Sequence, residues 1–157
     1  MGEGDGEQEK RFTAFSQKDR TKISPARYGP LRPMTTWTSD ELDKIGKAEE
    51  LQITSLRRDG TRRKPVTIWV VRVADELCVR SVNGRTARWF HGVQARHEGH
   101  ISAGGVDKEV IFTDADPKLN NDIDTAYRAK YRHYQANIVD SIVSPKARSA
   151  TIRLLAR

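Results

Sequence analysis

The fold is decided by residues 66–81, which read VTIWVVRVADELCVRS. Residues 66–73 are the run of the chain richest in β-branched residues, which favour strands, so they are predicted to form a central strand. Residues 74–76, Ala-Asp-Glu, are predicted to turn the chain, and residues 77–81 alternate like a second strand. The stretch therefore predicts an antiparallel hairpin.

Short elements separated by turn signals extend from this hairpin in both directions. On its N-terminal side, Thr38 and Glu41 have the spacing of a capping box that opens a helix. The other expected elements are strands at 51–56, 100–103, 109–113 and 151–155 and helices at 85–96, 119–134 and 138–143, with Pro145 stopping the last helix. Six strands with three or four helices, joined largely by hairpins, predict an α+β protein with an antiparallel barrel or sheet.

Length and composition predict one folded domain at residues 34–157, preceded by an arm. A chain of 157 residues can bury one substantial core. Residues 1–33 have no apolar periodicity and contain three prolines, which predicts a flexible or wrapping arm. Because no apolar run approaches the ~20 residues of a membrane span, we expect a cytoplasmic protein with no membrane partner. Cys78 is the only cysteine, which excludes an internal disulfide.

Positive charge is concentrated in one part of the chain. The segment 57–96 holds ten basic and three acidic residues, an excess equal to the net charge of +7 of the whole chain. Cations fixed on a folded unit raise the local concentration of anions and supply strong hydrogen bonds. The segment therefore favours a phosphorylated or otherwise anionic ligand.

Several motifs resemble the FMN-binding split-barrel superfamily, and within it an uncharacterised domain family related to deazaflavin-dependent nitroreductases. The similarity covers roughly residues 36–155. It is carried by Trp37-Thr38, Asp59-Gly60, Arg62-Arg63-Lys64-Pro65, Ile68-Trp69-Val70-Val71, Leu77-Cys78-Val79-Arg80-Ser81, Arg88-Trp89-Phe90 and residues 123–131. The resemblance implies an antiparallel split β-barrel of about six strands with flanking helices. It also implies a cofactor, either FMN or the deazaflavin F420, and a homodimer with the site at the subunit boundary.

The resemblance implies positions for the cofactor as well. Residues 62–64 match a basic turn that contacts the cofactor phosphate, Ser81 matches a serine that ends the next strand, and Trp89 matches an aromatic residue beside the ring system. Two details differ from those relatives, because the turn lacks a Ser-Gly step and Gly92 stands where Asn is usual. The expected cofactor-binding residues are Arg62, Arg63, Lys64, Arg80, Ser81, Arg88 and Trp89.

Two residues are candidates for proton transfer. His91 follows the aromatic pair, and imidazole titrates near neutrality, although an exposed surface histidine is the simpler interpretation. Tyr127 can donate a proton if it faces a pocket, but packing in the core is the simpler interpretation. On the same helix, the spacing of Asp124 and Arg128 predicts an ion pair. The spacing of His91, His97 and His100 matches no set of metal ligands, so no metal site is expected.

Three functions are compatible with these features. The first hypothesis is a flavin- or deazaflavin-dependent oxidoreductase that acts on a small organic substrate. The second is an enzyme of the same fold that binds no flavin and performs acid–base chemistry, such as isomerisation, cyclisation or dehydration, on a small anionic or aromatic substrate. The third, less favoured, is a nucleic-acid-binding module, because the pI near 9.8 is accompanied by no RNA- or DNA-binding motif.

Overall fold

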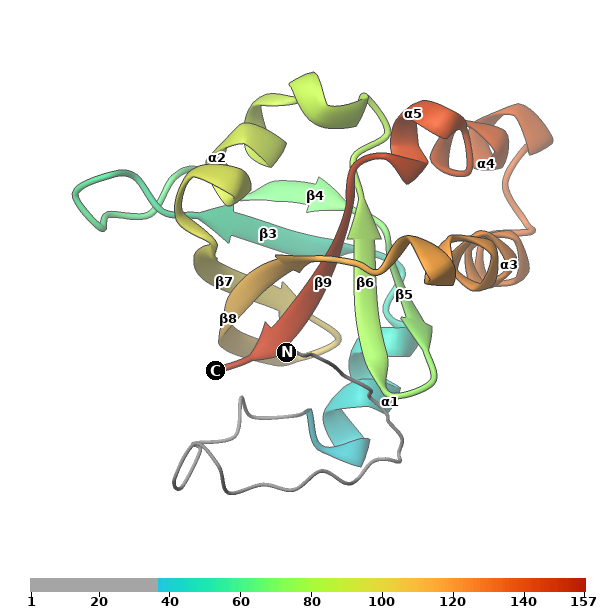
Figure 1. Ribbon diagram of the computed structural model, residues 1–157. Helices are drawn as coiled ribbons and strands as arrows, with labels where there is room; N and C mark the ends of the chain where they lie inside the picture. Colours follow the sequence, from blue (N-terminus) through green and yellow to red (C-terminus); the bar gives the residue numbers. More distant parts are fainter. Residues whose placement is uncertain (1–36) are drawn as a thin grey trace, which may run out of the picture. The chain divides into compact units, whose positions relative to one another are not determined.

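The structure, a computed structural model, describes residues 37–157, and the predicted arm at 1–33 lies outside the described residues. The described part contains one antiparallel sheet in the order β4-β3-β7-β8-β9-β6-β5. Its strands are β3 (Leu51–Ser55), β4 (Val66–Ile68), β5 (Val70–Val73), β6 (Glu76–Arg80), β7 (Glu98–Ala103), β8 (Val106–Asp114) and β9 (Thr151–Ala156). The sheet curves into a nearly closed barrel with one seam, between β4 and β5 (Figure 1). The predicted α+β split barrel is confirmed.

The β-branched run at 66–73 is the part of the barrel where the prediction was wrong. It forms two strands separated by Trp69, and these are the two edges of the sheet rather than one central strand. The first half pairs with β3, as in Val66 opposite Ile53, and the second half pairs with β6. β-Branched composition favours an extended backbone but carries no information about position in a sheet. The split raises the strand count from the expected six to seven.

Side chains of the helix α3 (Asn120–Lys130) and of the residue after it bond to the backbone at this break. The Tyr131 hydroxyl accepts a hydrogen bond from the Val70 amide at 3.3 Å, and the Lys130 ammonium donates to the Val70 carbonyl at 2.6 Å. The Tyr131 ring stacks on Trp69, with 3.9 Å between ring centroids. The edge at β5 is therefore covered by side chains of another element.

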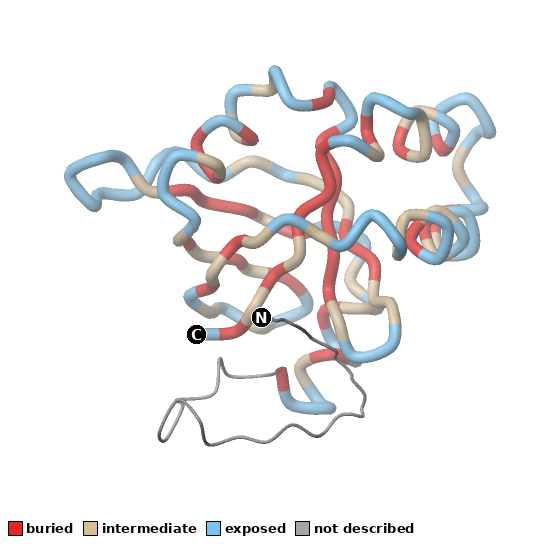
Figure 2. Tube along the Cα trace, in the orientation of Figure 1, coloured by how far each residue is buried: buried red, intermediate tan, exposed pale blue. Residues whose placement is uncertain are grey.

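Two apolar clusters occupy the two faces of the β5–β6 hairpin. Val70 and Val79 belong to the larger cluster, which fills the barrel. Val71 and Cys78 belong to a second cluster, which packs under α3. Burial raises the pKa of the Cys78 thiol to about 12. Figure 2 shows these buried positions following the strands, while most loops are exposed.

Helix α1 (Ser39–Lys47) begins as the sequence predicts. The Thr38 hydroxyl accepts from the Glu41 amide, the Glu41 carboxylate accepts from the Thr38 amide, and both bonds of the capping box are present. The indole of Trp37 donates to the Leu154 carbonyl at 3.0 Å. The start of the helix is therefore fixed both by its own caps and by the barrel.

The remaining helices flank the barrel. The expected helix at 85–96 is a 3₁₀ turn, η2 (Gly84–Thr86), followed by α2 (Arg88–Arg96), and another 3₁₀ turn, η3 (Pro117–Leu119), precedes α3. Helix α4 (Ala136–Ile142) ends before Pro145, and Pro145 then opens a further short helix, α5 (Pro145–Arg148), because proline suits the first helical turn. Helix α2 lies over β3 and β4, and α3, α4 and α5 gather on another side (Figure 1). Within residues 37–157, no helix has the length and apolar composition needed to cross a bilayer.

Candidate functional site

A pocket of about 320 Å³ lies between β3, β4 and α2, and it brings four of the predicted cofactor-binding residues together. Arg63 and Lys64 reach it from the loop before β4, and Arg88 and Trp89 reach it from the first turn of α2. The full lining is Ile53, Ser55, Arg57, Arg63, Lys64, Val66, Arg88, Trp89 and Val93. We call this site the basic pocket.

The charge of the basic pocket has one sign. Four cationic side chains line it and no carboxylate does. The side chains of Arg63, Lys64 and Arg88 make no hydrogen bond or ion pair with any other residue of the described range 37–157. The fourth cation, Arg57, donates to the carbonyl of Arg62 at 2.6 Å and to the Thr61 hydroxyl at 3.4 Å. Three cations are therefore available to an anionic ligand.

A tight turn gives the basic loop its shape. The Asp59 carboxylate accepts from the amide and the hydroxyl of Thr61, at 3.0 and 2.7 Å, and these bonds lower the pKa of Asp59. Gly60 follows with a φ of 90°, which favours glycine. The amide of Arg63 donates to the Ser55 carbonyl at 2.9 Å, so the loop returns to β3 beside the pocket. The turn thus fixes where the backbone of the basic residues lies.

The apolar wall of the pocket includes Trp89. Its ring meets Phe90 edge-on, with 6.0 Å between centroids and an angle of 78° between the planes. Phe90 is 1 % exposed and belongs to the barrel core, whereas Trp89 is partly exposed and packs against that core while lining the pocket. One member of the aromatic pair is a core anchor, and the other offers a flat surface to a ligand.

Arg62 is separated from the other two basic residues of its turn. It lines a different, smaller pocket of about 160 Å³, together with Glu98, His100 and Glu109. Arg62 forms an isolated β-bridge with Leu56, and side chains of successive residues in extended backbone point to opposite sides. A cofactor-binding role for Arg62 stays a prediction.

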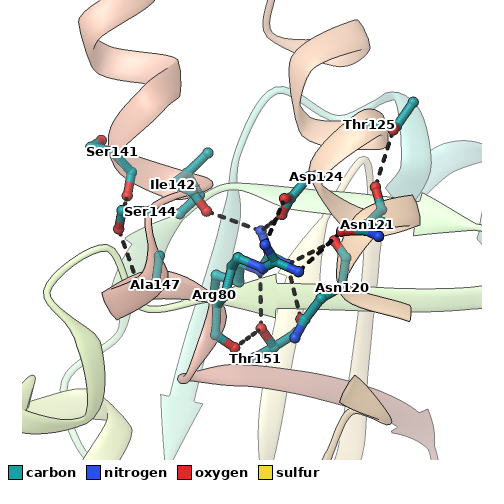
Figure 3. A network of polar contacts seen from close by, with 11 residues as sticks. Arg80, Asn120, Asn121, Asp124, Thr125, Ser141, Ile142, Ser144, Ala147 and Thr151 are labelled. Carbon is teal, nitrogen blue, oxygen red and sulfur yellow. Dashed lines mark hydrogen bonds and ion pairs between the residues drawn. The ribbon is translucent and has the colours of Figure 1, made fainter. Parts of the chain in front are cut away.

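Arg80 lies inside the protein, with a fully buried side chain (Figure 3). Its five N–H groups make five hydrogen bonds to protein atoms. The acceptors are the Thr151 hydroxyl at 3.0 Å, the Asp124 carboxylate at 2.5 Å, the Ile142 carbonyl at 3.2 Å, and the Asn120 carbonyl and side-chain oxygens at 3.2 and 3.1 Å. The guanidinium thus joins β6 to α3, α4 and β9. A cofactor-binding role for Arg80 stays a prediction, and it would require these bonds to be exchanged.

The other predicted site residues lie outside the basic pocket. Ser81 is 1 % exposed, and its hydroxyl has no hydrogen-bond partner among residues 37–157. His91 is exposed on α2, and Tyr127 is fully buried in the cluster under α3. The Tyr127 hydroxyl donates to the Trp69 carbonyl at 3.5 Å, and burial raises its pKa. Roles for these three residues stay predictions.

A wider depression of about 520 Å³ lies between η2, η3 and α5. Its two arginines are already engaged, because Arg85 donates to the Ser149 carbonyl at 2.8 Å and Arg148 to the Asn121 side chain at 3.1 Å. Asp114 adds a negative charge to the lining. Although larger, this depression lacks the free cations of the basic pocket and is the weaker candidate for an anion. In the described part of the chain, no three potential metal ligands gather.

A seven-stranded antiparallel barrel with one seam and flanking helices is a split-barrel fold, as the sequence motifs predicted. The chain belongs to the family described as "Uncharacterized protein conserved in bacteria (DUF2255)", which matches residues 41–154. The comparison with curated protein sequences found no match.

Solved structures with the same fold are distant in sequence. A conserved hypothetical protein from Mycobacterium tuberculosis has a TM-score of 0.55 at 10% identity, over 80% of this chain and 84% of that one. The heme storage protein HutZ from Vibrio cholerae has a TM-score of 0.56 at 11% identity, over 76% of this chain and 89% of that one. A FAD-binding protein from Mesorhizobium loti has a TM-score of 0.50 at 14% identity, over 78% of this chain and 92% of that one. At these identities the likeness concerns the fold.

Proposed function

We propose that this protein is an oxidoreductase that binds a phosphorylated flavin or deazaflavin in the basic pocket and acts on a small organic substrate. One observation carries the proposal: three cations without protein partners in the described chain face an apolar wall that contains an aromatic ring. This combination matches a ligand with an anionic end and a flat ring system. A FAD-binding protein of the same fold adds support at the level of the fold.

The residues present fit such a cofactor. Arg63, Lys64 and Arg88 would hold the phosphate, since guanidinium groups and ammonium groups both bind phosphate oxygens strongly. Trp89 and Val93 would contact the ring system. When bound, a flavin-type ring accepts or donates a hydride, while this chain binds and orients the ring and excludes water from part of it.

The alternative of acid–base catalysis without a cofactor has less support at this pocket. The lining contains no carboxylate, imidazole or phenol that could transfer a proton near neutral pH. The two candidates for that chemistry are apart from it, because His91 is exposed outside the lining and Tyr127 is buried under α3. The proposal includes a homodimer and a small-molecule substrate, which rest on the family resemblance.

Calorimetric titration of the protein with FMN and with a deazaflavin tests the proposal. A variant with Arg63, Lys64 and Arg88 replaced by Ala should lose at least a hundredfold in affinity, because each charge-assisted bond contributes about 1.5 to 3 kcal/mol. A control variant with Lys47, Lys118 and Arg132 replaced by Ala removes the same charge from exposed positions outside the pocket. It should bind nearly as well as the wild type.

Equal losses in both triple variants would show that only the net charge matters and would contradict a phosphate site. No binding of either cofactor by the wild type would refute the proposed function itself. Riboflavin, which has the same ring as FMN without its phosphate, measures how much of the affinity the cations supply.

A further inference from the structure

We infer that the depression between η2, η3 and α5 is a second ligand site, which takes a small organic carboxylate with an apolar body. We call it the second pocket. It shares no lining residue with the basic pocket, and its volume of about 520 Å³ is within the range of ~300 to 1,000 Å³ of small-molecule sites. Its lining is Arg85, Asp114, Ala115, Pro117, Asn120, Pro145, Arg148, Ser149 and Thr151. The inference does not depend on the proposed function.

Both arginines of the second pocket are held by the protein at one end and keep free donors at the other. Arg85 donates through Nη1 to the Ser149 carbonyl at 2.8 Å. Arg148 donates through Nη2 to the Asn121 side chain at 3.1 Å, and its Nη1 lies 3.7 Å from the Asp124 carboxylate. Within residues 37–157, the Nε atoms of both arginines and the Nη2 of Arg85 have no partner. Because each guanidinium is already oriented, a ligand that accepts from these donors loses less entropy on binding.

The buried Arg80 fixes a third donor of the second pocket (Figure 3). The side-chain oxygen of Asn120 accepts from the Arg80 guanidinium at 3.1 Å. This bond turns the amide nitrogen of Asn120 away from Arg80, and that nitrogen makes no hydrogen bond within residues 37–157. The Thr151 hydroxyl is held in the same way, because it accepts from Arg80 at 3.0 Å and donates to the Arg148 carbonyl at 2.8 Å. The lining therefore presents an amide donor beside the two arginines.

The charge balance of the second pocket favours an anion with a single charge. The lining holds two arginines and one carboxylate, that of Asp114, which accepts from the Gln94 amide at 3.2 Å. Arg80 adds a third guanidinium, and Asp124, which pairs with Arg80 and Arg148, adds a second carboxylate. Three guanidinium groups against two carboxylates leave one positive charge, which one ligand carboxylate balances. A phosphate monoester, with about −1.5 to −2 charges at pH 7, would leave excess negative charge beside Asp114.

Rigid apolar walls complete the second pocket. Pro117 and Pro145 each lie in the first turn of a short helix, where the proline ring fixes the backbone angle φ. A side chain caps each of these helices, Asp116 at the start of η3 and Ser144 at the start of α5. The two proline rings and the Ala115 methyl group form an apolar surface beside the donors. An aromatic carboxylic acid combines the two parts that such a lining recognises, a planar anion and an apolar body.

Titration of isotopically labelled protein with benzoate, followed by NMR, tests the inference. We expect saturable shifts of the backbone amide signals of η2, η3 and α5, and binding at least tenfold weaker for benzamide, which has nearly the same shape without the charge. Because the basic pocket also attracts anions, the titration is repeated with Arg63, Lys64 and Arg88 replaced by Ala. The shifts at η2, η3 and α5 should persist in that variant. Their absence in either protein, or equal binding of benzamide, would overturn the inference.

Single substitutions then test the named groups. Arg85→Ala should weaken benzoate binding about tenfold or more, the effect of a lost hydrogen bond to a charged group, whereas Arg132→Ala, which removes an exposed arginine outside both pockets, should leave it unchanged. Asp114→Asn should strengthen the binding of benzoate, and that of phenyl phosphate at the same signals by more, because it removes the competing charge. Melting temperatures identify any unfolded variant, and Arg85→Lys, which keeps the charge but loses the planar fork, then replaces Arg85→Ala. Full benzoate affinity in the Arg85 variants, or tighter binding of phenyl phosphate than of benzoate at these signals in the wild type, would contradict a carboxylate site.

Discussion

Trp89 and Phe90 are neighbours in sequence with different surroundings, so the same truncation at each should have opposite effects. Phe90 is 1 % exposed inside the barrel, and replacing it with Ala opens a cavity that should cost about 3 to 5 kcal/mol of stability. For a domain of this size that corresponds to a fall in melting temperature of roughly 6 to 20 °C. Because Phe90 does not line the basic pocket, FMN affinity at a temperature where the variant is folded should change little.

Trp89→Ala should have the opposite effect: a smaller loss of stability than Phe90→Ala and a larger loss of FMN affinity. Part of the Trp89 ring already faces the pocket, so its truncation should cost less stability than that of Phe90, about 1 to 3 kcal/mol. If a flavin ring stacks on it, the lost contact contributes about 1 to 3 kcal/mol of binding, or roughly five- to 150-fold in affinity. Urea unfolding measures the loss of stability of each variant, and calorimetric titration with FMN measures its loss of affinity. The reasoning would be refuted if Trp89→Ala were the more destabilised variant and still bound FMN with native affinity.

Three further outcomes are expected. Asp124→Asn should cost about 3 kcal/mol, because it leaves the buried Arg80 without its counter-charge, whereas Asp140→Asn, which breaks an exposed pair with Arg128, should cost under about 1 kcal/mol; urea unfolding compares them. Cys78 should not react with iodoacetamide at pH 8 in the native protein and should react readily in urea, because burial raises its pKa; mass spectrometry measures the adduct. Burial lowers the pKa of Lys130 to about 8, below its unfolded value near 10.5. The free-energy cost of burying the charged ammonium is therefore full below pH 8 and disappears as the pH rises toward 10.5. In urea unfolding, the wild type should gain stability relative to Lys130→Met between pH 7 and pH 10.

Local signals in the sequence were sufficient for the class of fold. The capping box of Thr38 and Glu41 depends on residues three apart, and the structure contains both of its bonds. The strands of the hairpin at 66–81 follow from β-branched residues and alternation, which are also local properties. What these signals could not supply was the position of a strand in the sheet, because that depends on partners distant in sequence. The break at Trp69 is such a case.

The contacts of charged residues show the same limit. Helical spacing predicted that Asp124 would pair with Arg128, but Asp124 binds Arg80, which is 44 residues away, and Arg128 pairs with Asp140. A spacing rule is sound for exposed helix surfaces, whereas a buried arginine takes the strongest acceptor that the fold brings to it. No pattern in the sequence indicates that Ser55 lines the basic pocket, because the pocket forms only when the fold places α2 next to the end of β3.

The cluster of cations was predicted as a region but not as a site. Four of the seven predicted cofactor-binding residues line one pocket. Arg62 and Arg63 are adjacent in the chain, yet they line different pockets, because extended backbone directs successive side chains to opposite sides. Composition records how many charges a segment carries, and only the local backbone decides which of them converge.

The coverage of the β5 edge by side chains of Lys130 and Tyr131 affects whether a second molecule can pair with the sheet at high protein concentration. Unpaired backbone groups at a sheet edge are templates on which another chain can add a strand, and long flat edges lead to aggregation. Here the outermost strands, β4 and β5, have only three and four residues. Tyr131 and Lys130 also bond to the amide and the carbonyl of Val70. A split barrel leaves a seam, and we expect the short edge strands and the bonds at Val70 to disfavour strand addition by a second molecule.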